Sequence, residues 1–143
     1  MNPKELSGLE WLQGCASGKY PHPPMAKTIP MEMKEITEGK VRFRVCASEA
    51  HLNPLGMVHG GFAATVLDSV TACAVHTMLE AGVPYATIDL NIKFTKEIPP
   101  GEAMWAEGRV INMSRRLGIA EGEIKDDAGN LYAHATASCM VKR

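Results

Sequence analysis

The chain has 143 residues, of which 45% are hydrophobic and 22% charged, and this composition excludes an intrinsically disordered protein. The formal net charge of -1 excludes the strongly basic surface that recruits nucleic acid. No apolar run reaches the roughly 18 residues of a membrane span, and the N-terminus lacks the basic and apolar regions of a secretory signal. We therefore expect a cytoplasmic protein that binds neither nucleic acid nor membrane.

The first 30 residues are predicted to form a helix and a connector ahead of a single main domain, residues 31–143. Within Pro3–Gly18, apolar residues lie close to helical spacing and glycines follow them, which predicts a short amphipathic helix. The segment Lys19–Pro30 carries four prolines and is predicted to be an extended connector.

The remaining elements alternate in a way that indicates an α+β protein. Residues 31–48 read as a hairpin that turns at Glu38 and Gly39, and residues 60–81 read as one long helix, which Gly82 and Pro84 end. In residues 85–96, the apolar side chains Ile88, Leu90, Ile92 and Phe94 alternate with polar ones. Further strands are predicted at 103–113, 117–127 and 131–142. We expect one curved antiparallel sheet that packs against the long helix.

Asp68 is the acidic residue inside the long predicted helix, where residues three and four apart share a face. That spacing places it on a stripe of mostly small residues (Gly61, Ala64, Thr65, Thr71, Ala72, Val75), beside a bulky row expected to press on the sheet (Phe62, Val66, Val70, Met78). Two interpretations stay open: a solvated helix carboxylate, or a carboxylate held in a cleft as nucleophile or general base.

The predicted helix begins within a His-Gly-Gly triplet, His59 to Gly61, and the two glycines are its first residues. A helix N-terminus exposes unpaired N–H groups with partial positive charge, and glycines leave access to them open. Gly60 and Gly61 could therefore polarise a carbonyl oxygen, or they could simply form a tight turn. His59 could serve as base, donor or loop anchor.

Other catalytic and binding motifs are missing from the sequence. It contains no GxSxG, no HExxH, no pair of histidines four apart on a helix and no phosphate-binding glycine loop. Four scattered cysteines without a CxxC pattern indicate reduced, buried thiols. We therefore expect no metal site.

The stretch "NPLGMVHGGFAATVLD", Asn53 to Asp68, resembles the signature of hot-dog-fold acyl-CoA thioesterases, of the PaaI-type, 4-hydroxybenzoyl-CoA thioesterase-like branch. An Asn is followed six residues later by His-Gly-Gly, and an acid stands nine residues after that His. The resemblance covers residues 31–141. It implies a hot-dog fold, in which an antiparallel sheet wraps around one long central helix, and hydrolysis of an acyl-CoA thioester to free acid and CoA. No cofactor is implied, because coenzyme A is part of the substrate.

The resemblance also implies roles for single residues. Asp68 matches the acid that attacks the thioester or activates water, and Gly60 matches the glycine whose N–H polarises the carbonyl. His59 helps to shape that site, and Asn53 positions the water or substrate. The resemblance places the site between protomers, with Asn53, His59 and Gly60 of one chain facing Asp68 of the other. It thus implies at least a homodimer, and homotetramers are usual.

Five further residues are weaker candidates. Thr87 falls where related enzymes place a Ser or Thr that assists the water, although an ordinary strand residue is the alternative. Gly61 is a candidate substrate contact. Ser114, Arg115 and Arg116 lie in a turn resembling one that meets the CoA phosphates, which suit the forked donors of Arg. A solvated basic turn is the alternative.

Two other functions compete with thioester hydrolysis. A hot-dog hydratase or dehydratase would use a catalytic His in a differently spaced motif. A non-catalytic acyl-CoA-binding module would usually carry a DNA-binding helix pair, for which the residues before Met31 leave little room. The nature of the acyl group stays open.

Overall fold

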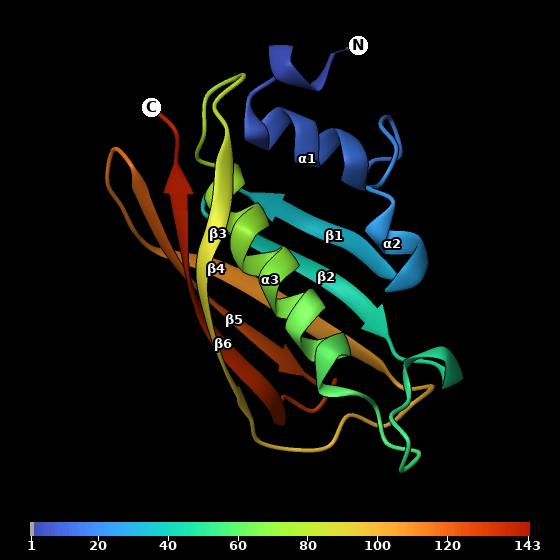
Figure 1. The fold of residues 1–143 in the computed structure, drawn as a ribbon. Helices are drawn as coiled ribbons and strands as arrows, with labels where there is room; N and C mark the ends of the chain where they lie inside the picture. The colour runs from blue at the N-terminus through green and yellow to red at the C-terminus, as the bar shows by residue number, and fades with distance from the viewer. Residues whose placement is uncertain (1) are drawn as a thin grey trace.

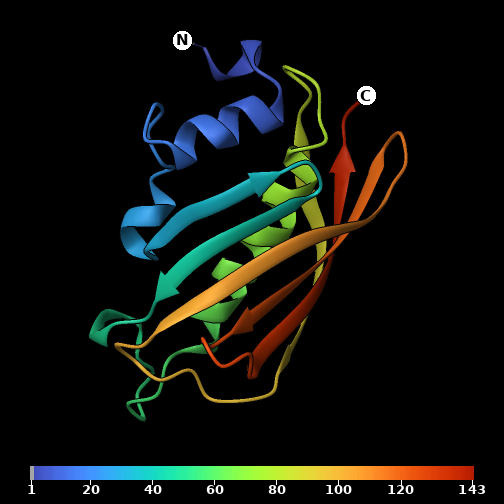
Figure 2. The same cartoon turned by 180° about the vertical axis from the view of Figure 1, so that it is seen from behind.

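The computed structural model describes residues 2–143 and has one antiparallel sheet wrapped around one long helix, α3 (Gly60–His76) (Figures 1 and 2). The strand order across the six-stranded sheet is β1-β2-β4-β5-β6-β3. This arrangement confirms the predicted sheet and helix. The strands are β1 (Met31–Thr37), β2 (Lys40–Cys46), β3 (Tyr85–Phe94), β4 (Ala103–Met113), β5 (Leu117–Lys125) and β6 (Leu131–Val141).

The N-terminal helix α1 (Gly8–Ala16) begins later than the segment predicted for it, because Ser7 caps it. The hydroxyl of Ser7 accepts from the Glu10 N–H at 3.3 Å, and the Glu10 carboxylate accepts from the Ser7 N–H at 2.9 Å. This reciprocal pair is a capping box. A short 3-10 turn, Pro3–Glu5, precedes it. Leu12 is buried in the same core as the sheet, so α1 packs onto the main domain.

The predicted connector is not extended throughout, because it contains the short helix α2 (Met25–Thr28). The Ile29 N–H donates to the Met25 carbonyl at 2.9 Å and closes its single turn. Pro24 stands at the N-cap in the αR region. Proline is tolerated at a helix start because its missing N–H would have no helical partner there. The proline-rich composition led to the prediction of an extended segment, although Pro24 stands at the start of the helix α2.

Helix α3 ends at His76, five residues before the predicted end at Ala81. The Thr77 hydroxyl donates to the Ala74 carbonyl at 2.6 Å and accepts from the Gly39 N–H at 2.7 Å. This contact ties the helix end to the turn between β1 and β2. Leu79, three residues after the helix end, is buried in the core at 2% exposure.

The faces of α3 match the predicted stripe in part. Thr71 and Val75 are fully buried against β5, where a Cβ on Gly122 or Gly118 would lie 3.1 Å from the Thr71 methyl or 2.8 Å from a Val75 methyl. Their placement on the small-residue stripe was wrong. Four residues of the predicted stripe do lie on the half-buried or exposed face around Asp68: Gly61, Ala64, Thr65 and Ala72. Ser69, which was not predicted, lies there as well.

Strand β3 forms one edge of the sheet and pairs with β6 alone among the described strands. A register shift between Thr87 and Asp89 breaks its alternation and leaves Ile88 exposed at 59%. Phe94, at the other end, is 58% exposed. This edge of the sheet therefore carries exposed apolar side chains.

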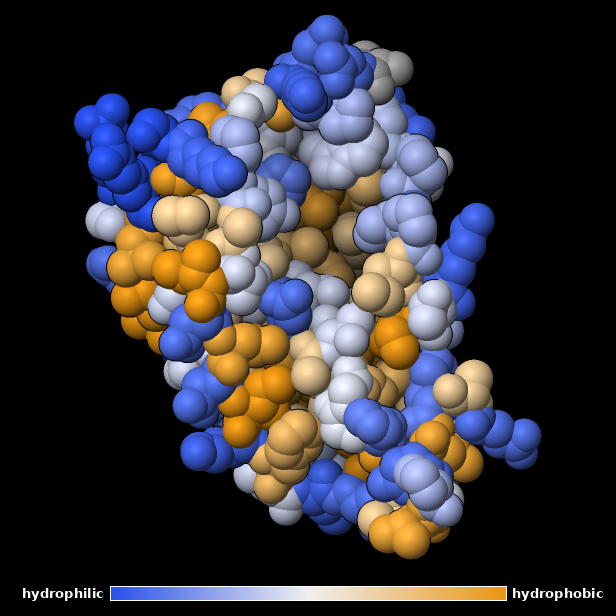
Figure 3. Space-filling model, viewed as in Figure 1, coloured by the Kyte–Doolittle hydropathy of each residue, from blue (hydrophilic) through white to orange (hydrophobic). Residues whose placement is uncertain are grey.

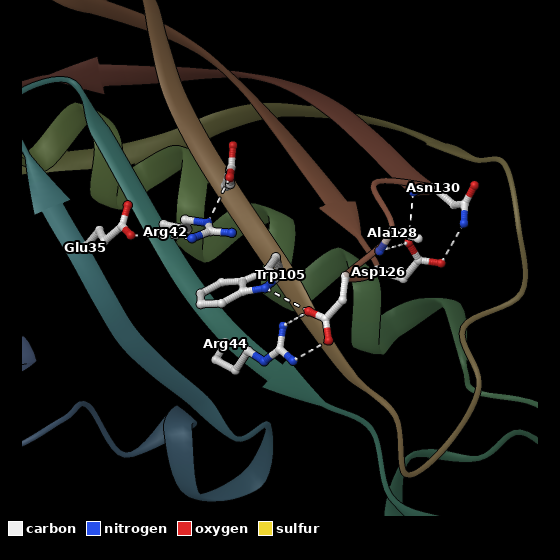
Figure 4. Close-up of polar contacts among 9 residues, drawn as sticks. Glu35, Arg42, Arg44, Trp105, Asp126, Ala128 and Asn130 are labelled. Atoms are coloured by element: carbon white, nitrogen blue, oxygen red, sulfur yellow. Dashed lines mark hydrogen bonds and ion pairs between the residues drawn. The ribbon is translucent and has the colours of Figure 1, made fainter.

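The outer face of the sheet, opposite α3, is covered by polar pairs (Figure 4). Arg44 donates two hydrogen bonds to the Asp127 carboxylate, at 2.7 and 3.2 Å, and the Trp105 ring N–H donates to the same group at 3.0 Å. The Arg42 guanidinium lies over the Trp105 ring at 3.6 Å. These contacts fix the β5–β6 turn to β2 and β4.

None of the helices in residues 2–143 is long and apolar enough to cross a membrane. All four cysteines are free thiols; Cys15 and Cys139 are buried, whereas Cys46 and Cys73 are half-buried. Within the same residues, no group of three His, Cys, Asp or Glu side chains is placed to hold a metal ion.

Candidate active site

Asp68 projects from α3 toward β3, where Thr87 meets it. The Thr87 hydroxyl donates to Asp68 Oδ1 at 2.8 Å, and Asp68 is half-buried. The second carboxylate oxygen, Oδ2, accepts no hydrogen bond from any residue in 2–143. The strand thus holds one oxygen and orients the carboxylate, while the other oxygen stays available to a ligand or water.

A cavity of about 230 Å³ opens beside Asp68 and is mostly apolar. Figure 3 shows a hollow with an apolar floor beneath α1, between α2 and α3. Asp68 is the one acidic residue in its wall. The lining comes from the connector, β1, β2, α3 and β3: His22, Pro23, Ala26, Met31, Met33, Phe43, Asp68, Ser69, Ala72, Cys73 and Tyr85.

Burial keeps two thiols and one phenol near Asp68 neutral. Desolvation raises the pKa of the Cys73 thiol to about 12, and it also raises the pKa of the Tyr85 phenol. Burial likewise raises the pKa of Cys139, whose sulfur lies 3.8 Å from the Thr87 hydroxyl. A thiol protonated at neutral pH is a poor nucleophile, so these cysteines do not form a thiolate centre.

His59 caps the N-terminus of α3. The ring Nδ1 of His59 accepts from the Gly61 N–H at 2.8 Å, and the backbone N–H of His59 donates to the His51 carbonyl at 2.8 Å. A Cβ on Gly61 would lie 2.8 Å from that Nδ1, so the capped turn requires glycine there. His59 Nδ1 is thus engaged in the helix cap, and a part for His59 in catalysis stays a prediction.

At this helix end, the backbone N–H of Gly60 is unpaired within the described residues, 2–143. Gly60 lines a second cavity of about 380 Å³, together with Ala63, Phe94 and Lys96. An unpaired N–H at a helix N-terminus attracts a carbonyl oxygen or an anion.

Asn53 organises the loop before the helix. The side-chain oxygen of Asn53 accepts from the backbone N–H groups of Leu55 at 3.0 Å and Met57 at 3.1 Å. The backbone N–H of Asn53 donates to the Met57 carbonyl at 2.7 Å. The oxygen is thus committed to the turn, which leaves the amide NH₂ as the part of Asn53 that could meet a substrate.

One chain does not bring all the predicted residues together. Gly60 and Asp68 stand eight residues apart on α3, a rise of about 12 Å, and they line different cavities. Ser114, Arg115 and Arg116 lie in the exposed β4–β5 turn, next to Gly118, which packs on Val75 near the far end of α3 from Gly60. Each chain holds two separate halves of the predicted site.

Sequence reasoning missed the residues that wall the Asp68 cavity, among them Ala26 of α2 and Phe43 of β2. The alternation of Met31 and Met33 indicated one face of a strand, but no local signal indicated that the proline-rich connector folds over that face.

Comparisons with known proteins bear on the family and the fold of this chain. The model of the thioesterase superfamily matches residues 55–133, more than half of the chain. Human acyl-coenzyme A thioesterase 13 is 29% identical over 96 residues, which cover 66% of this chain and 68% of that protein.

Two solved structures share the fold. A phenylacetic acid degradation-related protein from Ralstonia eutropha JMP134 is 32% identical, with a TM-score of 0.82 over 90% of this chain and 98% of that one. The E. coli PaaI protein gives a TM-score of 0.82 at 19% identity, over 96% of each chain. The predicted hot-dog fold and the predicted thioesterase resemblance are confirmed. The chain belongs to the thioesterase superfamily.

Proposed function

We propose that this protein hydrolyses acyl-CoA thioesters with Asp68 as nucleophile or general base and the Gly60 N–H as the group that polarises the thioester carbonyl. The observation that carries the proposal is the Asp68 carboxylate, held at one oxygen by Thr87 at 2.8 Å and placed in the wall of an apolar cavity. The similarity to an acyl-coenzyme A thioesterase supports the choice of substrate.

The reaction can proceed in two ways at Asp68. Its free oxygen takes a proton from water, which attacks the carbonyl carbon, or it attacks that carbon itself and water then hydrolyses the anhydride. In both cases the negative charge that develops on the carbonyl oxygen is stabilised by the Gly60 N–H and the helix N-terminus. In the first route the C–S bond then breaks, and the CoA thiolate takes back the proton held by Asp68. In the second route the C–S bond breaks as the anhydride forms, before water hydrolyses it, and the thiolate takes a proton from solvent. Both routes release the free acid and CoA.

The two groups come together between two chains in this proposal. Strand β3 carries Thr87 near its first residue, beside Asp68, and Phe94 at its last, beside Gly60. If two β3 edges pair antiparallel about a two-fold axis, the Thr87 end of one strand meets the Phe94 end of the other. The exposed Ile88 and Phe94 give this free edge apolar side chains to bury.

Several finer parts of the proposal rest on the resemblance. Asn53 would position water or substrate through its free NH₂, and Gly61 would line the carbonyl site. Ser114, Arg115 and Arg116 would meet the CoA phosphates, for which Arg115 and Arg116 are exposed. The homotetramer, the cytoplasmic location and the lack of a cofactor also stay predictions.

The test is hydrolysis by Asp68→Asn, with free CoA detected as its thiol. We expect a loss of roughly 10²–10⁴-fold in kcat, the range for removal of a positioned base, while Glu38→Gln, in the exposed β1–β2 turn, keeps wild-type turnover. Wild-type rates from Asp68→Asn would refute the role of Asp68. Tight binding of acyl-CoA by the wild type without hydrolysis would instead identify a binding module.

A further inference from the structure

We propose that residues 21–28, called the arm below, set the longest acyl chain that the enzyme accepts, with Ala26 as the limiting side chain. The inference rests on the proposed function, because it assigns the acyl group to the cavity beside Asp68. The ligand class is an apolar acyl group of medium length.

The arm separates two cavities. The cavity beside Asp68 has about 230 Å³, and a groove of about 540 Å³ lies on the other side of the arm. Four residues line both: His22, Pro23, Ala26 and Met31. An acyl chain that extends into the cavity from Asp68 therefore contacts these residues before it can reach the outer groove.

The arm is fixed at both ends. Before it, the Tyr20 N–H donates to the Gly14 carbonyl at 3.1 Å, and the Cys15 thiol donates to the Pro21 carbonyl at 3.5 Å. At its far end, the Thr28 carbonyl lies 2.7 Å from Nε2 of His51, which is 8% exposed. The arm is therefore a fixed wall of the cavity.

The protonation of His51 follows from its partners. Nδ1 lies 2.9 Å from the Ser48 N–H, and a backbone N–H can only donate. Nδ1 is thus the acceptor, and Nε2 carries the proton that is donated to the Thr28 carbonyl. Because the His51 carbonyl also accepts from the His59 N–H, the same residue holds the arm and the turn that leads into α3.

The cavity size sets the expected chain length. An apolar cavity of about 150 Å³ holds benzene, so the space beside Asp68 has room for roughly nine carbons. The side chains around it are apolar apart from His22, Asp68, Ser69 and Tyr85. We therefore expect activity to fall for acyl chains longer than this, unless the arm is displaced.

The test measures kcat/KM for straight-chain acyl-CoAs from four to sixteen carbons. Ala26→Phe is expected to lower kcat/KM for the longest good substrate of the wild type at least tenfold, since a single methylene in an apolar pocket is worth about 10- to 200-fold. Butyryl-CoA should be hydrolysed as before. Met25→Phe is the matched control, because Met25 is 52% exposed and lines neither cavity.

A second variant acts in the opposite direction. His51→Asn keeps an acceptor near the Ser48 N–H but loses the donor to Thr28, so the arm loosens and longer chains gain relative to short ones. The proposal is overturned if both variants show the same dependence of kcat/KM on acyl-chain length as the wild type. It is also overturned if kcat/KM falls by the same factor for every acyl-chain length. Neither result touches the proposed function, which fails if Asp68→Asn stays active or if the wild type binds acyl-CoA without hydrolysing it.

Discussion

Asp68 and Thr87 illustrate, at the scale of single residues, which parts of the site a sequence can predict. The acid and the threonine were singled out by their match to a family signature, and the folded chain brings them to 2.8 Å from each other across 19 residues of sequence. The bulge in β3 at this position could not be predicted, because it depends on the register with β6.

The roles of His59 and Asn53 depended on hydrogen bonds that residue spacing does not determine. Both residues use a side-chain acceptor to hold backbone N–H groups of their own loop. Asn53 Oδ1 and His59 Nδ1 are therefore occupied within the loop, whereas the Gly60 N–H stays without a partner in the described chain. This contrast makes the glycine, rather than the histidine, the group to test.

Replacement of Gly60 by proline removes that N–H and little else. Proline suits the first position of a helix, and the extended His59 (φ -62°, ψ 137°) suits the residue before a proline. We expect Gly60→Pro to lower kcat by about 10²–10³-fold, the range for loss of one oxyanion donor.

The matched control is Gly60→Ala, which keeps the N–H and adds a Cβ about 3.4 Å from the Phe94 ring. It should retain most of the activity in the same thiol-release assay. Equal losses in both variants would mean that the side chain, and not the N–H, is what the site does not tolerate.

At the scale of elements, the strand and helix pattern was predictable and the element ends were not. The hairpin pattern of residues 31–48 and the alternation in residues 85–96 predicted β1, β2 and β3, and the His-Gly-Gly triplet predicted the start of α3. The early end of α3 and the helix α2 follow from tertiary contacts, namely the burial of Leu79 and the packing of the connector over β1 and β2. The strand order, in which β3 pairs with β6, also has no local signal in the sequence.

Close packing of α3 on the sheet gives a prediction about stability. A Cβ on Gly108 of β4 would lie 2.0 Å from the Val70 carbonyl oxygen, which belongs to the helix backbone and cannot move aside alone. We expect Gly108→Ala to lower the free energy of unfolding by about 1–3 kcal/mol or more, as overpacking does, measured by urea titration at one fixed protein concentration.

Gly122→Ala on β5 is the control for that measurement. Its Cβ would meet only side-chain methyl groups of Thr71, Val70 and Leu67, at 3.1 to 3.3 Å, and these can shift by small amounts. We expect a smaller change in unfolding free energy than for Gly108→Ala. If the two variants were equally stable, the close approach of α3 to β4 would be contradicted.

At the scale of the whole molecule, the proposal divides the site of one chain into two halves, with the sheet edge β3 running between them. The Asp68 half lies in one cavity and the Gly60 half in another, about 12 Å apart along α3. β3 contacts both halves, at Thr87 and at Phe94. The proposed enzyme is therefore complete only when the edges of two chains meet.

A subunit-mixing experiment tests this claim most directly. Asp68→Asn and Gly60→Pro are each expected to be inactive, and the two chains are unfolded, mixed in equal amounts and refolded together. If each site combines Gly60 of one chain with Asp68 of the other, half of the dimers are mixed and one of their two sites is intact. The mixture then recovers about a quarter of the wild-type activity. Recovery of no activity in demonstrably mixed dimers would place both groups in one chain and contradict the two-chain site.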